Sequence, residues 1–150
     1  MVETRFGRIG CGICPDRWCR ETALAHRGAE LRVFPSTIGS EPAYPGRDDA
    51  AHWRRTMQGQ AAANLIPLVA SNRIGTETSG DVSMTFYGTS FIAGTTGEIL
   101  VEALRETESV ITATVDLDGA ARFRDSWGGV RRLARGKDRD PRAEAAHGFA

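Results

Sequence analysis

Residues 8–34 read RIGCGICPDRWCRETALAHRGAELRVF, and this stretch decides the fold. In residues 8–14, apolar side chains alternate with glycine, which predicts a buried strand. Residues 18–27 predict a helix, closed by Gly28 at a position where a left-handed residue commonly ends a helix. Residues 30–34 predict a second strand, stopped by the proline that follows. Strand, helix and strand in this order predict a parallel pair with a right-handed crossover.

Downstream of this unit, a second helix is expected to begin at Asp48 or Asp49 and to run to about Asn64. Trp53, Met57, Ala61 and Leu65 recur every fourth residue and give that helix an apolar stripe. The other expected elements are loops at 36–48 and 72–82, a strand at 66–71, a hairpin formed by 84–93 and 98–102, a strand at 110–115 and a short helix at 117–123.

The composition is that of an ordinary soluble domain. The chain has 150 residues, 41% of them hydrophobic, and a formal net charge of zero. We therefore expect no nucleic-acid partner and no membrane association. Three cysteines and no apolar leader favour a reduced, cytoplasmic location. Residues 1–128 are expected to form one domain, and the polar residues 129–150 a disordered tail.

Cys14 is the main candidate for chemistry. It closes the first predicted strand just before a helix start, and a strand-to-helix elbow is a common way to expose a nucleophile. The following residue, Pro15, has no backbone N–H. Because the residue after such a nucleophile often donates to the oxyanion, Pro15 predicts an impaired site.

A metal or redox site is a weaker interpretation of Cys11, Cys14 and Cys19. On a strand, residues three apart point to opposite faces, and no second cysteine pair or histidine pair completes a zinc site. We expect no metal and no organic cofactor, and we expect Cys11 and Cys19 to be small buried residues.

The remaining titratable candidates are mostly explained by surface or capping roles. They are His26, His52 and His147, with the carboxylates Asp16, Glu21, Glu41 and Glu77. Glu41 is the most interesting of them, because it lies in a loop after a strand and is suited to a cationic ligand. A solvated loop acid is the equally weighted alternative.

Several stretches together resemble the nitrilase (carbon–nitrogen hydrolase) superfamily. They lie between about Thr4 and Arg132 and read GRIG, IC, DRW, GAE, IGSEP, HWRRTMQG, VASNRIG, FYG, SFIAG and SWG. The resemblance implies an α/β fold, namely the C-terminal half of an αββα sandwich that often forms larger oligomers.

The resemblance also implies an activity and two roles. The expected reaction is hydrolysis of a carbamoylated amine to the free amine, carbon dioxide and ammonia, without a cofactor. Cys14 falls on the family nucleophile, which would attack the ureido carbonyl. Glu41 falls in a loop that borders the family's pocket, and we hypothesise that it binds the distal ammonium of putrescine.

The chain departs from the family pattern in two ways. The family's glutamate base and lysine belong to an N-terminal half, which we expect this truncated chain to lack, and Lys137 does not match that lysine. Pro15 stands where the family usually has a residue such as tryptophan. We therefore expect the chain alone to be weak or inactive, and poorly soluble without a partner.

Other functions remain open. The substrate could be a different ureido or ω-amide compound. The chain could instead be a non-catalytic half-domain that docks on an intact homologue. A thiol-dependent metal or redox module is the most distant alternative.

Overall fold

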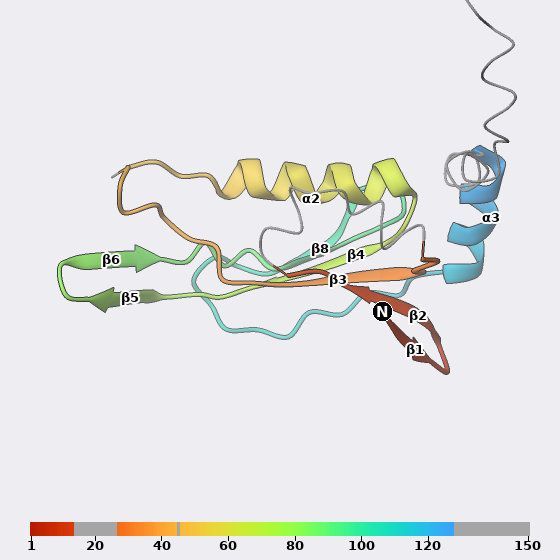
Figure 1. The fold of residues 1–150 in the computed structure, drawn as a ribbon, viewed down its shortest axis with the longest axis horizontal. Coiled ribbons are helices and arrows are strands. Elements are labelled where there is room, and N and C mark those ends of the chain that lie inside the picture. Colours follow the sequence, from red (N-terminus) through yellow and green to blue (C-terminus); the bar gives the residue numbers. More distant parts are fainter. Residues whose placement is uncertain (14–26, 45, 128–150) are drawn as a thin grey trace, which may run out of the picture.

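The structure, a computed structural model, describes residues 1–13, 27–44 and 46–127. A six-stranded sheet of order β1-β2-β3-β4-β7-β8 carries the fold, and helix α2 (Ala50–Asn64) lies along one face (Figure 1). This layering of helix on sheet confirms the expected α/β class. The strands are β1 (Val2–Thr4), β2 (Gly7–Cys11), β3 (Leu31–Ser36), β4 (Leu68–Asn72), β7 (Phe91–Ala93) and β8 (Ile99–Glu102).

The centre of the sheet is parallel and its flanks are antiparallel. β2 pairs with β3 and β3 with β4 in parallel, which confirms the predicted parallel pair. β4 pairs with β7 and β7 with β8 in antiparallel fashion. β1, which the sequence did not reveal, forms an antiparallel hairpin with β2. The helix predicted at 18–27 lies outside the described residues, while Gly28 has the positive φ of 83° expected at a helix end.

Helix α2 packs on the sheet through the predicted stripe. Trp53, Met57 and Ala61 are each 0% exposed and belong to one hydrophobic cluster. The Trp53 ring meets Phe91 of β7 edge to face, with ring centroids 5.6 Å apart. Leu65, at φ 52°, ends the helix, and its N–H donates to the carbonyls of the last turn. The sheet side of this cluster consists of Phe34, Leu68, Ala70, Phe91 and Ala93.

Pro35 does not stop β3 as the sequence predicted. The strand continues to Ser36, and Pro35 is in register with Ser71 of β4. Along a strand, alternate residues direct their backbone groups to opposite neighbours. Pro35 therefore shares the β2 side with Val33, and β2 ends at the level of Val33, where Cys11 is its partner. The missing N–H therefore removes no bond with β4, and the pairing of β2 with β3 ends just before Pro35.

Two other sequence predictions need correction in the middle of the chain. The expected loop at 72–82 contains half of a separate hairpin, formed by β5 (Thr76–Ser79) and β6 (Val82–Thr85) around Gly80. The hairpin was missed because its polar strands have no apolar alternation. The hairpin predicted around residues 94–97 is confirmed as β7 and β8, but Met84 belongs to β6.

The strand predicted at 110–115 is not formed in the described chain. These residues have no secondary structure, and Val110 is 94% exposed. The helix predicted at 117–123 is confirmed and is longer, as α3 (Leu117–Trp127). The predicted tail at 129–150 lies outside the described residues.

The sheet face opposite α2 has no helix layer among the described residues (Figure 1). Alternation places the half-buried Leu31 and Val33 of β3 on this face, with Val69 of β4 and Val101 of β8. We call these four residues the open face. No helix in the described ranges is long and apolar enough to cross a membrane.

Candidate active site

The candidate site lies where the three parallel strands end. β2, β3 and β4 run in the same direction, so their carboxyl ends meet at one edge of the sheet. In α/β folds this edge is where loops form ligand sites. Residues 12–13 leave β2 there, residues 37–49 leave β3, and residues 73–75 leave β4.

Gly12, two residues before Cys14, is held in place against β3, whereas Cys14 itself lies outside the described residues. The Gly12 N–H donates to the Val33 carbonyl at 3.0 Å, which extends the pairing with β3 one residue past β2. Gly12 also lies against the Phe34 ring so closely that a Cβ there would clash. The chain therefore points toward Cys14 from the carboxyl end of β2. Pro15, Asp16, Cys19, Glu21 and His26 also lie outside the described residues, as do Lys137 and His147.

The loop after β3 is held against residues 85–87. The Ser40 N–H donates to the Thr85 carbonyl at 2.8 Å, and the Thr85 N–H donates to Ser40 Oγ at 2.9 Å. A Cβ on Gly39 would lie 2.5 Å from the Thr85 carbonyl oxygen. Glycine at position 39 therefore permits the close approach that fixes the residues before Glu41.

Asn72, the last residue of β4, joins the loop after β3 to the loop between β6 and β7. Its side-chain oxygen accepts from the Ile38 N–H at 2.9 Å, and its amide donates to the carbonyls of Ile38 and Gly88 at 3.0 and 3.1 Å. Its own backbone N–H donates to Ser90 Oγ at 2.8 Å. Sequence reasoning did not assign this role. The signal was a short amide side chain at the carboxyl end of a parallel strand.

A cavity of about 600 Å³ opens between the loop after β3 and the first turn of α2. Glu41, Arg47, Asp49 and His52 contribute its ionisable groups, and Trp53 lies at its inner wall. Arg47 Nε and Asp49 Oδ2 are 2.7 Å apart, and the hydrogen bond and charge of Asp49 raise the pKa of Arg47. The acidic and basic side chains of the lining, apart from the histidine, are two carboxylates and one guanidinium. The cavity therefore has an excess negative charge that favours a cationic ligand.

Glu41 is an exposed member of this lining. Its Oε1 accepts from the Ala43 N–H at 3.2 Å, and its carbonyl accepts from the Tyr44 N–H at 2.9 Å. These bonds form a turn that holds the carboxylate at the cavity. Glu77, another candidate, lies instead on β5 and pairs with Arg73, and it does not line this cavity.

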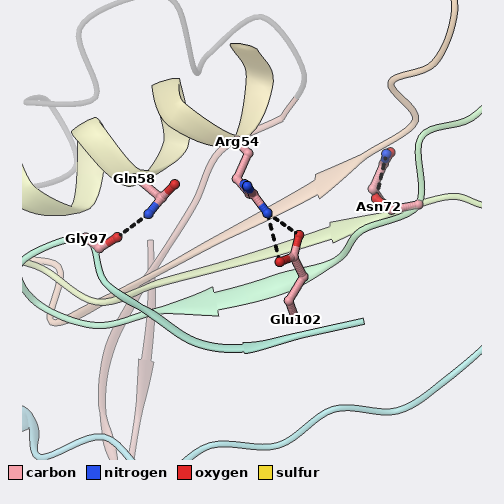
Figure 2. Close-up of polar contacts among 6 residues, drawn as sticks. Arg54, Gln58, Asn72, Gly97 and Glu102 are labelled. Carbon is pink, nitrogen blue, oxygen red and sulfur yellow. Dashed lines mark hydrogen bonds and ion pairs between the residues drawn. The ribbon is translucent and has the colours of Figure 1, made fainter. Parts of the chain in front are cut away.

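Ion pairs secure the start of α2 beside the cavity. Both oxygens of Glu102 on β8 accept from Arg54 Nη1 at 2.8 Å (Figure 2). Asp48 pairs with Arg105 at 2.6 Å, and the buried Tyr87 hydroxyl accepts from the Asp49 N–H at 3.1 Å. The Ala50 N–H and then Arg105 lower the pKa of Asp48. These contacts join the start of α2 to the edge strand β8 and to the residues that follow it.

The thiol and histidine predictions have mixed outcomes. Cys11 is exposed rather than buried, because it shares a sheet face with Val33 that no described layer covers. His52 lies exposed in the first turn of α2, which agrees with the expected surface role, and it also lines the cavity. The described ranges contain no group of three or more His, Cys, Asp or Glu side chains that could hold a metal ion.

Comparison with known proteins gives consistent matches. The sequence profile of the carbon–nitrogen hydrolase family matches residues 1–125. An N-carbamoylputrescine amidase from Arabidopsis thaliana is 52% identical over 87% of this chain and 46% of its own length. A citrullinase from Francisella tularensis is 44% identical over 84% of this chain and 45% of its own length.

A solved structure agrees with these matches. The carbon–nitrogen hydrolase from Helicobacter pylori G27 superposes with a TM-score of 0.77 at 32% identity, over 85% of this chain and 46% of its own. The chain thus spans about half the length of the relatives that it matches.

Proposed function

This chain belongs to the carbon–nitrogen hydrolase family, and on that premise we propose that it is the nucleophile-bearing half of an N-carbamoylputrescine amidase. The reaction would release putrescine, carbon dioxide and ammonia. The single observation that supports the proposal is an acidic cavity lined by the loop that leaves the carboxyl end of β3, the strand that pairs in parallel with β2.

We assign two roles within this proposal. The thiolate of Cys14 attacks the ureido carbonyl carbon, the C–N bond to the terminal nitrogen breaks, and that nitrogen leaves as ammonia after gaining a proton. Water then hydrolyses the resulting S-carbamoyl intermediate, which regenerates the thiol and releases the N-carboxylated amine. This carbamate then loses carbon dioxide by breaking its C–N bond, and putrescine remains. Glu41 binds the distal ammonium of the substrate at the other end of the cavity.

By the resemblance, the base and the lysine of the family belong to the part of the domain that this chain does not match. Without them, and with Pro15 following the nucleophile, we expect little turnover from the chain by itself. In the proposed function, residues 1–127 therefore supply the nucleophile and part of the substrate pocket of the enzyme.

Ammonia release from N-carbamoylputrescine tests the nucleophile. The chain should be co-expressed with the portion of the Arabidopsis relative that it does not match, so that both halves are present. Turnover that disappears in Cys14→Ala supports the proposal. Turnover that survives this substitution contradicts it.

Putrescine binding tests the role of Glu41. By calorimetry on the same preparation, Glu41→Gln should weaken binding about tenfold or more, because it removes a charge-assisted hydrogen bond. Asp81→Asn removes an exposed charge on the turn between β5 and β6, away from the cavity, and should leave binding unchanged. Equal losses in both variants would indicate a general charge effect instead of a specific contact.

A second substrate class, exemplified by citrulline, has one observation in its favour. Arg47 lines the same cavity as Glu41 and could accept the carboxylate of an amino acid. Its guanidinium is already paired with Asp49, which makes this substrate the second candidate. Faster turnover of citrulline than of N-carbamoylputrescine would reverse the order.

A further inference from the structure

Two residues of opposite charge lie next to each other in the lining of the candidate cavity. Arg47 and Asp49 follow the turn that holds Glu41 and precede α2, and all three residues line the cavity. Arg47 Nε and Asp49 Oδ2 are 2.7 Å apart, which makes a charge-assisted hydrogen bond. Among the described residues of the lining, Arg47 carries the one guanidinium. A ligand carboxylate that enters the cavity therefore meets a guanidinium that already has an acidic partner.

Backbone contacts, which do not involve the Asp49 carboxylate, hold this pair in place. The Arg47 N–H donates to the Tyr44 carbonyl at 3.2 Å, and the Tyr44 ring centroid lies 5.8 Å from the guanidinium carbon. The Asp49 N–H donates to the Tyr87 hydroxyl at 3.1 Å. Asp49 stands at the N-cap position of α2, but its side chain makes no capping hydrogen bond. An amide in place of the carboxylate therefore leaves the start of α2 with its backbone contacts.

Asp49 competes well for Arg47 because it belongs to the same chain. A group tethered by a short linker reaches its partner at an effective concentration of roughly millimolar. Asp49 also repels a ligand carboxylate that approaches Arg47, since like charges at close range disfavour each other. The side chains of Arg47 and Asp49 are 58% and 32% exposed, so water weakens both effects. We therefore expect a discrimination of about tenfold against a ligand carboxylate.

The two candidate substrates differ by one such carboxylate. N-Carbamoylputrescine and citrulline share a ureido end and a distal ammonium. Citrulline has in addition a carboxylate on the carbon that carries the ammonium. Glu41 is suited to the ammonium of either compound, whereas the extra carboxylate needs a cation or several N–H donors. In this cavity the guanidinium that could serve it is paired with Asp49.

We propose that Asp49 is a specificity-determining residue of the site. By holding Arg47 in an ion pair, it leaves the carboxylate of a ureido amino acid without a partner. The cavity then selects ureido amines that have no carboxylate. The ureido group in this inference rests on the proposed function, whereas the selection of an amine over an amino acid depends on the cavity lining alone.

Putrescine and ornithine test the selection without any turnover, because they differ only in the carboxylate. Their dissociation constants are measured by calorimetry on the preparation used for the Glu41 test. We expect putrescine to bind about tenfold more tightly than ornithine, and Asp49→Asn to remove this preference. Asp49→Ser, which keeps a residue favoured at a helix N-cap, is a second variant with the same expected result. A preference that changes by less than about threefold in a folded variant overturns the proposal.

Glu77→Gln is the matched control for the loss of a carboxylate. It breaks an exposed ion pair with Arg73 that lies outside the cavity lining. The preference for putrescine should stay as it is in the wild type. An equal change in this control would show a general charge effect and would contradict the proposal.

Arg47→Gln identifies the group through which Asp49 acts. Combined with Asp49→Asn, it should remove the gain in ornithine binding, because the ligand carboxylate then has no guanidinium to pair with. A gain that survives in the double variant overturns the proposal, since it would come from the removal of a charge alone. In Asp49→Asn, kcat/KM for citrulline relative to N-carbamoylputrescine should rise in parallel with ornithine binding. Binding that follows these expectations without turnover of either substrate supports the role of Asp49 and counts against the proposed function alone.

Discussion

At the scale of single residues, the candidate site depends on residues that hold the loop backbone in place. Asn72, Gly39 and Tyr87 each fix a loop, and none of them is expected to react with a substrate. Glu41 lines the cavity from the loop after β3, and His52 lines it from α2. Loss of a loop contact should therefore affect ligand binding through position, as well as stability.

Asn72→Ala tests this dependence. It removes one acceptor and two donor contacts and leaves the Ile38 N–H without its partner. We expect a loss of about 1–3 kcal/mol in the free energy of unfolding, measured by urea denaturation of the co-expressed preparation. Ser71→Ala changes the exposed neighbouring residue and should have little effect. Equal costs would mean that the Asn72 contacts contribute no more than a surface hydroxyl.

Pro15 is predicted to limit the rate. Pro15→Ala restores a backbone N–H beside Cys14, and one oxyanion donor is typically worth about 10²–10³ in kcat. In the co-expressed preparation we expect a gain that approaches this range in kcat, with a smaller change in KM. An unchanged kcat would show that the missing N–H does not limit the reaction.

Asp48 gives the fold a predictable acid sensitivity. Its pKa is lowered from 3.8 in the folded state, so its stabilisation is present at neutral pH and is lost as the pH falls through the folded pKa. Asp48→Asn should lower stability at pH 7 and reduce the further loss below about pH 4. Thermal melts between pH 2.5 and pH 7 measure this, with Asp81→Asn as the control. Parallel curves for wild type and Asp48→Asn would contradict the assignment.

At the scale of elements, helix α2 provides the buried side chains that pack against one face of the sheet. Met57→Ala should cost about 2–5 kcal/mol, because Met57 is fully buried in the cluster and its loss leaves a cavity. Arg55→Ala, on the exposed side of the same helix, should cost little. Urea denaturation compares the two variants. Similar costs would mean that α2 packs differently from the arrangement described.

The sequence predicted the elements whose pattern is local. The stripe of α2 was sufficient, because it shows directly which face is buried. The alternation in residues 8–14 located β2 but not its buried face, since Gly10 and Gly12 are buried whereas Cys11 and Ile13 are exposed. The sequence failed for the β5–β6 hairpin, where Thr76 pairs with Thr85 and Thr78 with Ser83 through polar side chains. The sequence also wrongly predicted that β3 stops before Pro35. Whether a proline interrupts a strand depends on which neighbouring strand its missing N–H would face, and the sequence does not show that neighbour.

The site was predictable in part for the same reason. Glu41 was found because loops after parallel strands tend to form sites, and it does line the cavity. The roles of Asn72 and His52 depend on contacts between segments far apart in the sequence, and no local pattern indicates them. Cys14 remains a prediction from the sequence, as it lies outside the described residues.

At the scale of the whole molecule, the open face predicts that the chain alone has low solubility. We expect it to bind the dye ANS and to precipitate or self-associate at micromolar concentrations, because apolar sheet surface stays in contact with water. Co-expression with the unmatched half of the relative should reduce both effects. A soluble monomer with one cooperative thermal transition and no dye binding would contradict this prediction.

Pro35 has a consequence for aggregation. It lies where β3 extends beyond the described end of β2, and its missing N–H denies a foreign strand one bond at that step in the sheet. Prolines at such positions act as gatekeepers against amyloid-like stacking. Residues 110–115 contain no proline and no charge, so misassembly of newly made chains should begin there and should spare the step at Pro35.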